Sequence, residues 1–396
     1  MKTDTKLVYL GRKGAKKHWT INSPATQTTT INFPTYKDFL YADTLDSDFE
    51  NQMKPNTLTY GREGSDITYE LANMISELEN ADATIITSTG ASALSVALTA
   101  FVSQGDHIIL TESCYMVAQN VCTKFLKKFG VEYTIVSPSI DKEIEKYIKP
   151  KTKVIHFESP ASKTFQIQEI DEISKVAKKH NIITIFDNTW GGPLCFKPLE
   201  HGIDISVQSC SKYIDGHSDS FLGAISMKKQ HYKTIYSCFR YLVPNAAHYN
   251  VYLTLRGIRT MSIRMKQHFK SGMKIAKWLE KRKEVLEILY PPLPSSPYHK
   301  RWKKYFKSGT GLMGIVLNKQ YTVEQLSSML DKLKYFALGY SWGCYQSVIT
   351  AGDLSSSTEY SKYGKNTYMR IYIGLEDPED LIEDLKQGFS RLKKNK

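Results

Sequence analysis

Short apolar segments alternate with amphipathic stretches between Asn80 and Ile225. This alternation is typical of a largely parallel β-sheet with helices on its faces. A helix is predicted from about Ala91 to Val102, because from Leu94 onward apolar residues recur at i, i+3, i+4 and i+7 and form one face. The predicted strands are Ala83–Thr87, His107–Leu110, Tyr133–Val136, Val154–Phe157, Ile182–Phe186, Ile203–Val207 and Leu222–Ser226.

The chain on either side of this block has a different character. Residues 1–56 are polar and show little periodicity, so we expect an extended, irregular arm. A long amphipathic stretch from about His248 to Leu289 precedes a proline-rich segment that must break any helix. Strand-like segments at Gly314–Leu317 and Met369–Ile373 and a helical one at Val323–Leu333 then predict a smaller α+β domain. The expected organisation is an arm over 1–56, a large domain over 57–250 and a C-terminal domain over 251–396.

Length and composition exclude several classes of protein. With 396 residues and 41% hydrophobic content, the chain can bury a sizeable core and is too long for a single small domain. Its six cysteines lack C-x-x-C pairing, which favours reduced structural thiols over a zinc site. The first twenty residues contain no apolar run of signal-peptide length, and no segment reaches the ~18 apolar residues of a membrane span. We therefore expect a soluble cytoplasmic protein.

The net charge of +13 raises the question of a nucleic-acid surface. The basic residues are dispersed, however, apart from short clusters at 12–17, 300–304 and 393–396. No nucleic-acid-binding motif accompanies them. We expect no nucleic-acid partner.

Two motif matches fail on their context. Gly309–Gly314 matches G-x-G-x-x-G, but the dinucleotide fingerprint needs a strand before it and a helix after it, and here a strand follows. Ser209–Lys212 matches the S-x-x-K of acyl-serine enzymes, yet Ser209 ends a predicted strand instead of opening a helix. His217 and Asp219 lack a third metal ligand at a recognisable spacing, so hydrogen bonding in a turn is expected and no metal site is predicted.

Three strand ends carry groups that could act together. Asp187 follows the apolar run at 182–186, Lys212 follows another strand end, and Gly90-Ala91 opens a helix where backbone N–H groups can bind phosphate. Each has a plain structural explanation as well: a turn acid, one lysine among many, a tight turn. Together they meet the needs of pyridoxal phosphate, namely an acid for the ring nitrogen, a lysine for a Schiff base and a phosphate cradle.

The segment Ser211–Asp219 resembles the pyridoxal phosphate attachment motif of the Cys/Met-metabolism enzymes, within aminotransferase-like fold type I. The resemblance implies an α/β fold with a mostly parallel seven-stranded sheet domain and a smaller C-terminal α+β domain. It spans nearly the whole chain, because further segments fall in family order. These are Tyr60–Gly64, Gly105–Ile108, Glu158–Pro160, Asp187–Thr189 and Arg370–Glu376.

The resemblance implies roles for particular residues. Lys212 would hold the cofactor and then remove the substrate Cα proton, Asp187 would keep the ring nitrogen protonated, and Tyr115 would stack on the ring. Arg370 would grip the substrate carboxylate as a planar fork. Ser341 and Trp342 would help to place that carboxylate. Phosphate contacts are implied for Gly90, Ala91, Ser209 and Ser211 and, from the neighbouring subunit, for Tyr60 and Arg62.

Shared sites of this kind imply a homodimer, doubled into a tetramer as in relatives. Asp187-Asn188-Thr189-Trp190 and Tyr340-Ser341-Trp342-Gly343 look like the bacterial cystathionine β-lyases, which implies β-elimination of L-cystathionine to homocysteine, pyruvate and ammonia in methionine biosynthesis. Three residues depart from the family pattern: Asp215, Cys344 and Gln346. γ-Elimination, cysteine desulfhydration and alanine racemisation stay open as alternatives on the same scaffold, as does a binding protein that has lost catalysis.

Overall fold

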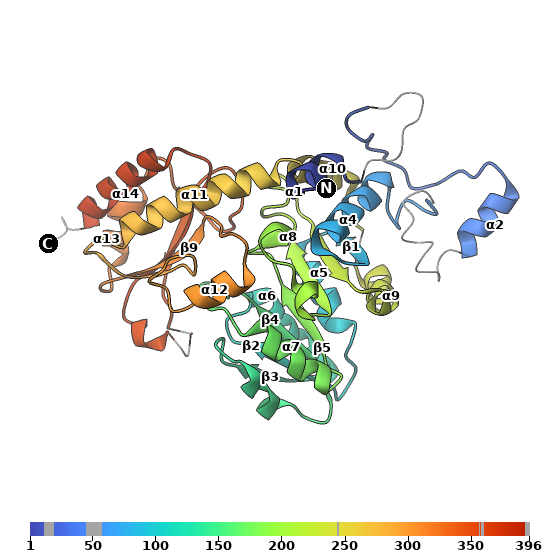
Figure 1. Ribbon diagram of the computed structural model, residues 1–396, viewed down its shortest axis with the longest axis horizontal. Coiled ribbons are helices and arrows are strands. Elements are labelled where there is room, and N and C mark those ends of the chain that lie inside the picture. The colour runs from blue at the N-terminus through green and yellow to red at the C-terminus, as the bar shows by residue number, and fades with distance from the viewer. Residues whose placement is uncertain (12–19, 45–57, 244, 356, 358–359, 393–396) are drawn as a thin grey trace.

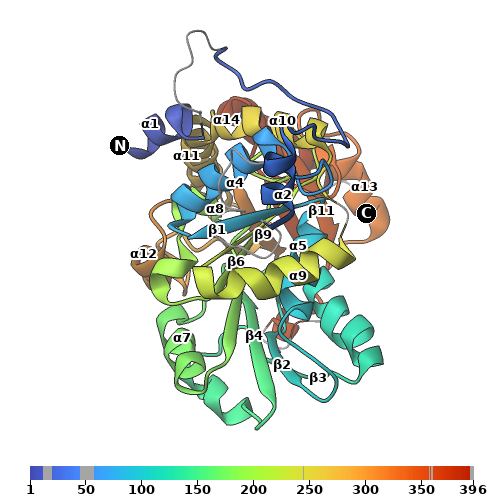
Figure 2. The ribbon, with the colours of Figure 1, turned by 90° about the vertical axis from the view of Figure 1, so that its right-hand side faces the viewer.

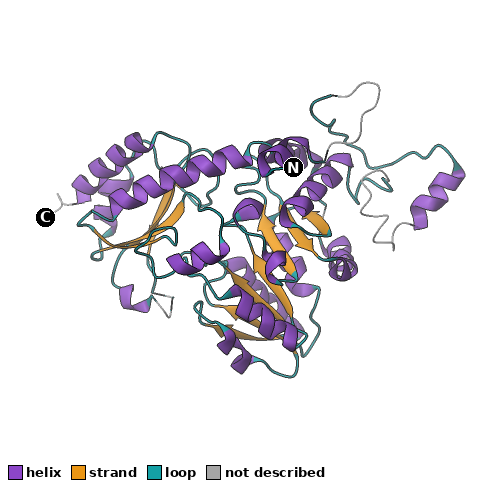
Figure 3. Cartoon of the chain, viewed as in Figure 1, coloured by secondary structure: helices purple, strands orange, loops and turns teal. Residues whose placement is uncertain are grey.

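The computed structural model describes residues 1–11, 20–44, 58–243, 245–355, 357 and 360–392. The basic clusters at 12–17 and 393–396 lie outside the described residues. The described chain builds two sheets, each with helices packed on it (Figure 1 and Figure 3). Among its helices, none is long and apolar enough to cross a membrane.

A seven-stranded sheet lies at the centre of the larger part, with the strand order β1-β7-β6-β5-β4-β2-β3. Strand β7 runs antiparallel to both of its neighbours, and the strands from β6 to β3 pair in parallel. The predicted mostly parallel sheet is therefore confirmed. Its strands are β1 (Ala83–Thr87), β2 (His107–Thr111), β3 (Glu132–Val136), β4 (Thr152–Glu158), β5 (Ile183–Asp187), β6 (Ile205–Ser209) and β7 (Gly223–Met227).

Apolar side chains cover both faces of this sheet, because successive residues of a strand point to opposite sides. Ile85, Ile108 and Val154 pack with helices on one face, and Ile86 and Phe157 pack with helices on the other. Helices bury both surfaces of the sheet in this way (Figure 2). The first face carries α5 (Gly90–Thr99), α6 (Met116–Asn120) and α9 (Tyr232–Leu242); the second carries α4 (Asp66–Glu79), α7 (Ile170–Lys179), α8 (Gly192–Cys195) and α10 (His248–Ile258).

The C-terminal part contains a five-stranded sheet in the order β10-β11-β12-β9-β8. Helices α11 and α13 both contact α14 beside this sheet (Figure 1). The predicted α+β character is present. The elements are α11 (Met261–Leu279), β8 (Val285–Leu289), α12 (His299–Tyr305), β9 (Leu312–Leu317), α13 (Val323–Leu330), β10 (Ala337–Leu338), β11 (Val348–Gly352), β12 (Tyr368–Tyr372) and α14 (Pro378–Leu392).

Two regions differ from the sequence expectation. The amphipathic stretch at 248–289 is not one helix: α10 ends at Ile258, α11 begins at Met261 and ends at Leu279, and the last five residues form β8. Helix α10 also crosses the expected boundary at residue 250. The boundaries of the three expected units stay predictions.

Within its described residues, 1–11 and 20–44, the expected irregular arm contains the helices α1 (Thr3–Tyr9) and α2 (Tyr36–Thr44). Helix α1 is too short to show a periodicity or to be stable alone. Tertiary contacts hold it: Leu7 is buried, and Arg259 Nη1 donates to the carbonyl oxygens of Leu7 and Leu10 at 2.9 and 2.8 Å. Helix α2 projects away from the sheets (Figure 1), and its Tyr36 and Phe39 are exposed.

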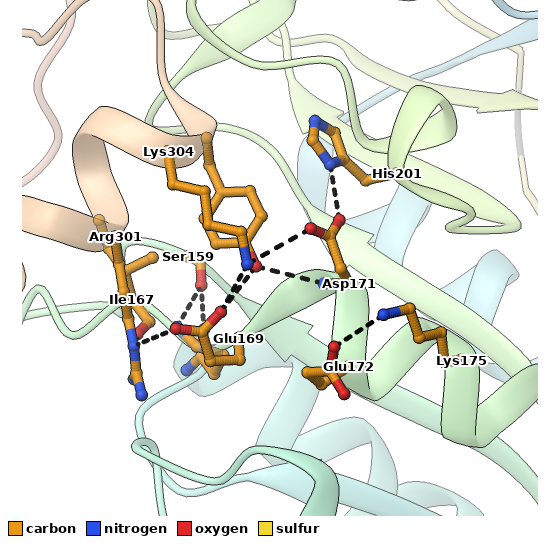
Figure 4. Close-up of polar contacts among 11 residues, drawn as sticks. Ser159, Ile167, Glu169, Asp171, Glu172, Lys175, His201, Arg301 and Lys304 are labelled. Atoms are coloured by element: carbon orange, nitrogen blue, oxygen red, sulfur yellow. Dashed lines mark hydrogen bonds and ion pairs between the residues drawn. The ribbon is translucent and has the colours of Figure 1, made fainter.

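A polar network joins α12 to the start of α7 (Figure 4). Glu169 accepts from Arg301 Nε and Lys304 Nζ, both at 2.9 Å, and Asp171 accepts from His201 Nδ1 at 2.8 Å. Although partial burial opposes it, the hydrogen bonds and positive charges from Lys304 and its neighbours hold the pKa of Glu169 below its usual range. The basic residues at 300–304 thus include a charge-paired group that anchors the C-terminal part to the large sheet.

Candidate active site

Lys212 lies three residues beyond the carboxyl end of β6, where its side chain is partly buried. Its Nζ donates a hydrogen bond to Ser341 Oγ at 2.5 Å and lies 5.6 Å from the centre of the Trp342 ring. Burial first, and the positive charge of Arg370 second, lower the pKa of Lys212 to about 8. An amine of this kind can both release and accept a proton near neutral pH. The sequence-predicted Lys212, Ser341, Trp342 and Arg370 therefore lie together.

The loop carrying Ser341 approaches the lysine very closely. Ser341 has a φ of +72°, which side-chain-bearing residues seldom adopt, and Gly343 has a φ of +97°. A Cβ at Gly343 would lie 2.8 Å from both Cα and the carbonyl carbon of Lys212, so only glycine fits there. Arg370, on β12, donates from Nη2 to the Ser341 carbonyl oxygen at 3.2 Å. Arg370 and the Gly343 turn thus fix Ser341 against Lys212.

Asp187 is the last residue of β5 and is 5% exposed. Its Oδ1 accepts from the backbone N–H of Thr189 at 2.9 Å. Burial raises the pKa of Asp187, which the Thr189 bonds and the charge of Lys212 oppose. In the part of the chain that the structure describes, no lysine or arginine forms an ion pair with it. A cationic group placed beside Asp187 would therefore be strongly bound.

The start of α5 packs against the end of β6. Thr89 caps this helix through a bond from the Ser92 N–H at 2.9 Å. A Cβ at Gly90 would lie 2.6 Å from Cβ and 2.7 Å from Oγ of Ser209, so glycine allows the contact. Ala91 is exposed on the first helical turn. The predicted phosphate residues Gly90, Ala91 and Ser209 therefore meet at a helix N-terminus, which favours anions.

Ser211, the fourth predicted phosphate residue, has its hydroxyl hydrogen-bonded to the backbone of Leu222. Its Oγ accepts from the Leu222 N–H at 3.0 Å, so this hydroxyl helps to hold β7 beside the Lys212 turn. The same hydroxyl donates to the Leu222 carbonyl oxygen at 3.4 Å, so donation to an anion would have to replace that long bond. Its role toward phosphate stays a prediction.

Tyr115 and Glu158 connect two further strand ends. Tyr115 lies in the loop after β2 and is 46% exposed, and its backbone N–H donates to Glu158 Oε2 at 2.6 Å. Glu158 is the last residue of β4 and pairs in register with Asp187. Sequence reasoning gave Glu158 no role. Its place at a strand end, like that of Asp187, was the available signal.

Among the described residues, neither Tyr60 nor Arg62 forms a hydrogen bond, ion pair or ring contact with Lys212. Tyr60 is 46% exposed, and the exposed Arg62 side chain donates to Glu63 Oε1 from Nε at 3.2 Å and lies over the Tyr60 ring. Glu63 is held in turn by Tyr236 Oη, which donates to Oε2 at 2.7 Å. The exposed Arg62 side chain is thus linked through Glu63 to Tyr236 on α9.

The three departures from the family pattern occupy different environments. Asp215 is fully buried and accepts from the N–H groups of His217 and Ser218 at 3.0 and 3.1 Å, so it shapes the turn after Lys212. Cys344 is buried beside the Gly343 turn, and Gln346 is exposed. Of these three, Asp215 has a clear structural function.

Glu79, on α4, supports the site from the opposite face of the sheet. It is fully buried, and its Oε1 accepts from Asn188 Nδ2 at 2.9 Å and also from Gln208 Nε2. Asn188 follows Asp187, and Gln208 precedes Ser209. The carboxyl ends of β5 and β6 are therefore tied to one buried carboxyl group.

Glu79 makes folding stability depend on pH. Burial raises the pKa of Glu79 to about 7 from an ordinary value near 4.5. Between these values the folded chain keeps a proton that the unfolded chain has released, so stability falls as pH rises, by about 3 kcal/mol in all. We expect Glu79→Gln to remove this fall, since its amide oxygen can accept the same two bonds. Denaturant unfolding at pH 5 and pH 8 measures it.

Glu77→Gln is the matched control for that experiment, because Glu77 lies on the same helix but is exposed and pairs with Lys6. Exposed pairs contribute little, about 1 kcal/mol or less. This variant should keep the wild-type difference between the two pH values. A Glu79→Gln protein that also kept it would show that another group titrates.

The chemistry of these groups fits pyridoxal phosphate. Lys212 is a partly buried amine with a lowered pKa, Asp187 is a buried carboxyl group without an ion pair, and the Gly90 contact forms a cradle that a Cβ would fill. When bound, the cofactor supplies an aldehyde that condenses with amino groups and an electron-poor ring that stabilises negative charge on Cα. Lys212 would hold the aldehyde, Asp187 the ring nitrogen, and the start of α5 the phosphate.

Known proteins resemble the chain over nearly its full length. An L-alanine/L-glutamate racemase of Wolbachia pipientis is 38% identical over 99% of this chain and 98% of its own. A cystathionine beta-lyase of Escherichia coli is 33% identical over 99% of both. The solved cystathionine gamma-lyase of Lactobacillus plantarum, complexed with L-serine, shares the fold with a TM-score of 0.87 at 25% identity, covering 99% of this chain and 100% of its own.

The family of Cys/Met metabolism PLP-dependent enzymes matches residues 4–390. Its cofactor is pyridoxal 5'-phosphate. Both the motifs around Lys212 and the two-sheet architecture agree with this match. The chain therefore belongs to the Cys/Met metabolism PLP-dependent enzyme family.

Proposed function

We propose that this enzyme catalyses β-elimination of L-cystathionine to homocysteine, pyruvate and ammonia, as a cystathionine β-lyase of methionine biosynthesis. The observation that carries the proposal is the contact between Lys212 and Ser341, with Arg370 bonded to the same serine. This contact supports the proposal because an amine with a lowered pKa lies near an arginine that could bind a carboxylate. The Escherichia coli relative with this name supports the choice of substrate.

Each residue of the site has its own role in the proposed reaction. Arg370 presents two parallel N–H donors to the substrate α-carboxylate, and Ser341 limits its rotation. With that carboxylate fixed, Lys212 removes the Cα proton from a defined direction. Burial keeps water from competing for these bonds. When the cofactor is bound, Asp187 would hold its ring nitrogen, and a carboxylate at that position would favour the protonated ring, which accepts electrons more readily.

We propose further that each site is completed by a second copy of the chain. Tyr60 and Arg62 are exposed, and Arg62 forms an ion pair with Glu63 of its own chain. If they reach the phosphate of a neighbouring subunit, the homodimer is the smallest active unit, and a dimer of dimers follows from the resemblance to relatives.

Mixed dimers test the sharing of sites. Lys212→Ala and Arg62→Ala proteins, each weakly active or inactive alone, should regain activity when their subunits are exchanged. One mixed dimer then contains one intact site, so up to about half of the wild-type activity per dimer is expected. The measurement is cystathionine turnover before and after exchange. Absence of recovery, despite exchange confirmed by mass-tagged subunits, would contradict shared sites.

Racemisation is the second candidate, because the 38% identical relative is named an L-alanine/L-glutamate racemase. It begins with the same removal of the Cα proton and needs only return of a proton to the opposite face. Elimination needs a leaving group on the β-carbon in addition. Which of the two reactions occurs therefore depends on whether the substrate has a leaving group on its β-carbon, as well as on the residues of the site.

Product identification tests the proposal. The enzyme is supplied in turn with L-cystathionine, L-cysteine, L-alanine and L-glutamate, and keto acids and D-amino acids are quantified. Pyruvate and homocysteine from cystathionine, with the highest kcat/KM of the panel, are expected. Production of 2-oxobutyrate would assign γ-elimination, and faster formation of D-alanine or D-glutamate would assign racemisation.

A further inference from the structure

Glu158 places a second carboxyl group beside the one that is expected to face the ring nitrogen. It ends β4 as Asp187 ends β5, and the two residues are register partners on adjacent parallel strands. Side chains at paired positions of neighbouring strands lie on the same face of a sheet. Both carboxyl groups therefore point to the face that carries α5 and α6.

This arrangement is electrostatically unfavourable in itself. Burial and then the negative charge of Asp187 raise the pKa of Glu158. A like charge next to Asp187 also opposes the ionised state that Asp187 needs. Other contacts of Glu158 must offset the free-energy cost of burying it beside Asp187.

Two hydrogen bonds provide those contacts. The Tyr115 N–H donates to Oε2 at 2.6 Å, and Ser162 Oγ donates to Oε1 at 2.8 Å. Tyr115 lies at the start of α6, beyond β2, and Ser162 lies in the loop beyond β4. The Tyr115 side chain is 46% exposed. The bond to Glu158 thus connects its backbone to the strand end that borders Asp187.

We propose that Glu158 is a positioning residue that ties the Tyr115 loop to the end of β4, and so fixes the ring-stacking tyrosine relative to Asp187. This inference rests on the proposed function, in that Tyr115 and Asp187 are taken to contact the cofactor. Glu158 acts through Tyr115 and is not itself assigned a proton transfer. What matters is the position of its oxygen atom, and not its charge.

Two substitutions of Glu158 distinguish the effect of its oxygen position from the effect of its charge. Glu158→Gln removes the ionisable group but keeps a carbonyl oxygen for the Tyr115 N–H, and its amide N–H can donate to Ser162 Oγ in place of the bond that Ser162 donates in the wild type. Glu158→Asp keeps the charge but withdraws the oxygen by one methylene. Ser162→Ala is the control, because it removes the other bond and leaves the Tyr115 bond in place.

The measurement is titration of each apoprotein with pyridoxal phosphate, followed by visible circular dichroism of the bound cofactor. Without the bond from the Tyr115 N–H the Tyr115 loop loses its link to β4, so Glu158→Asp should weaken cofactor binding about tenfold or more and reduce the dichroic band. Glu158→Gln and Ser162→Ala should stay within about threefold of wild type. Thermal unfolding of the apoproteins verifies that all are folded.

The opposite pattern would overturn the proposal: wild-type binding by Glu158→Asp together with weak binding by Glu158→Gln would assign the role to the charge. Wild-type binding and dichroism in both would show that the Tyr115 contact does not matter. No substrate enters these titrations. A wrong substrate assignment therefore leaves the result intact, whereas a wild-type chain that binds no cofactor would count against the proposed function itself.

Discussion

Replacement of Lys212 by alanine is expected to lower turnover of L-cystathionine by at least about a thousandfold, since it removes both the cofactor attachment point and the base. The variant should still fold, because Lys212 is only partly buried and belongs to neither core cluster. Steady-state assays with pyridoxal phosphate in excess measure the loss.

Lys178→Ala is the matched control for Lys212→Ala. Lys178 is an exposed lysine near the end of α7, on the segment that leads into the start of β5, and it is not one of the candidate site residues. It should leave kcat and KM at wild-type values. Turnover by Lys212→Ala within about tenfold of wild type would exclude Lys212 as the principal base.

Replacement of Asp187 by asparagine is expected to lower kcat about a hundredfold. Asparagine can still accept from the Thr189 N–H but carries no charge, so the ring nitrogen loses the partner that keeps it protonated. A hundredfold loss corresponds to about 2.7 kcal/mol of transition-state stabilisation. Rapid-mixing measurements of Cα proton removal from deuterated and ordinary substrate locate the loss at that step.

The conservative variant Asp187→Glu restores the charge on a longer side chain, and it should recover part of the lost rate. Recovery by glutamate but not by asparagine is the pattern that a charge effect requires. If asparagine retained wild-type kcat, the carboxylate would serve only as a turn residue that accepts from Thr189.

Much of the large domain follows from local sequence. All seven predicted strands are present, with ends within two residues, because buried parallel strands are short apolar runs bounded by turns. The antiparallel direction of β7 was not predicted, since strand direction depends on how the chain crosses the sheet. The break between α10 and α11 has no proline to signal it and lies instead where Arg264 donates to the Gly257 carbonyl oxygen at 2.8 Å.

Some features of the candidate site can likewise be predicted from local sequence, and others depend on tertiary packing. Asp187, Lys212 and Gly90 can be located from the sequence because Asp187 directly follows a predicted strand, Lys212 comes a few residues after another, and Gly90 opens a predicted helix. The contact of Lys212 with Ser341 joins residues 129 positions apart, and the glycine requirement at Gly343 arises from the same packing. Neither the Lys212–Ser341 contact nor the glycine requirement can be inferred from the spacing of residues in the sequence. Ser341 was predicted from the family resemblance. The pairing of Glu158 with Asp187 depends on β4 and β5 being neighbours in register.

Peptide mapping of the borohydride-reduced wild-type enzyme tests the central claim most directly. Reduction fixes the cofactor to the lysine that holds it, and mass spectrometry of the proteolytic peptides identifies that lysine. We expect one phosphopyridoxyl group per chain, on Lys212. A group found on another lysine, or an unmodified Lys212 peptide from protein that was saturated with the cofactor before reduction, would contradict the account.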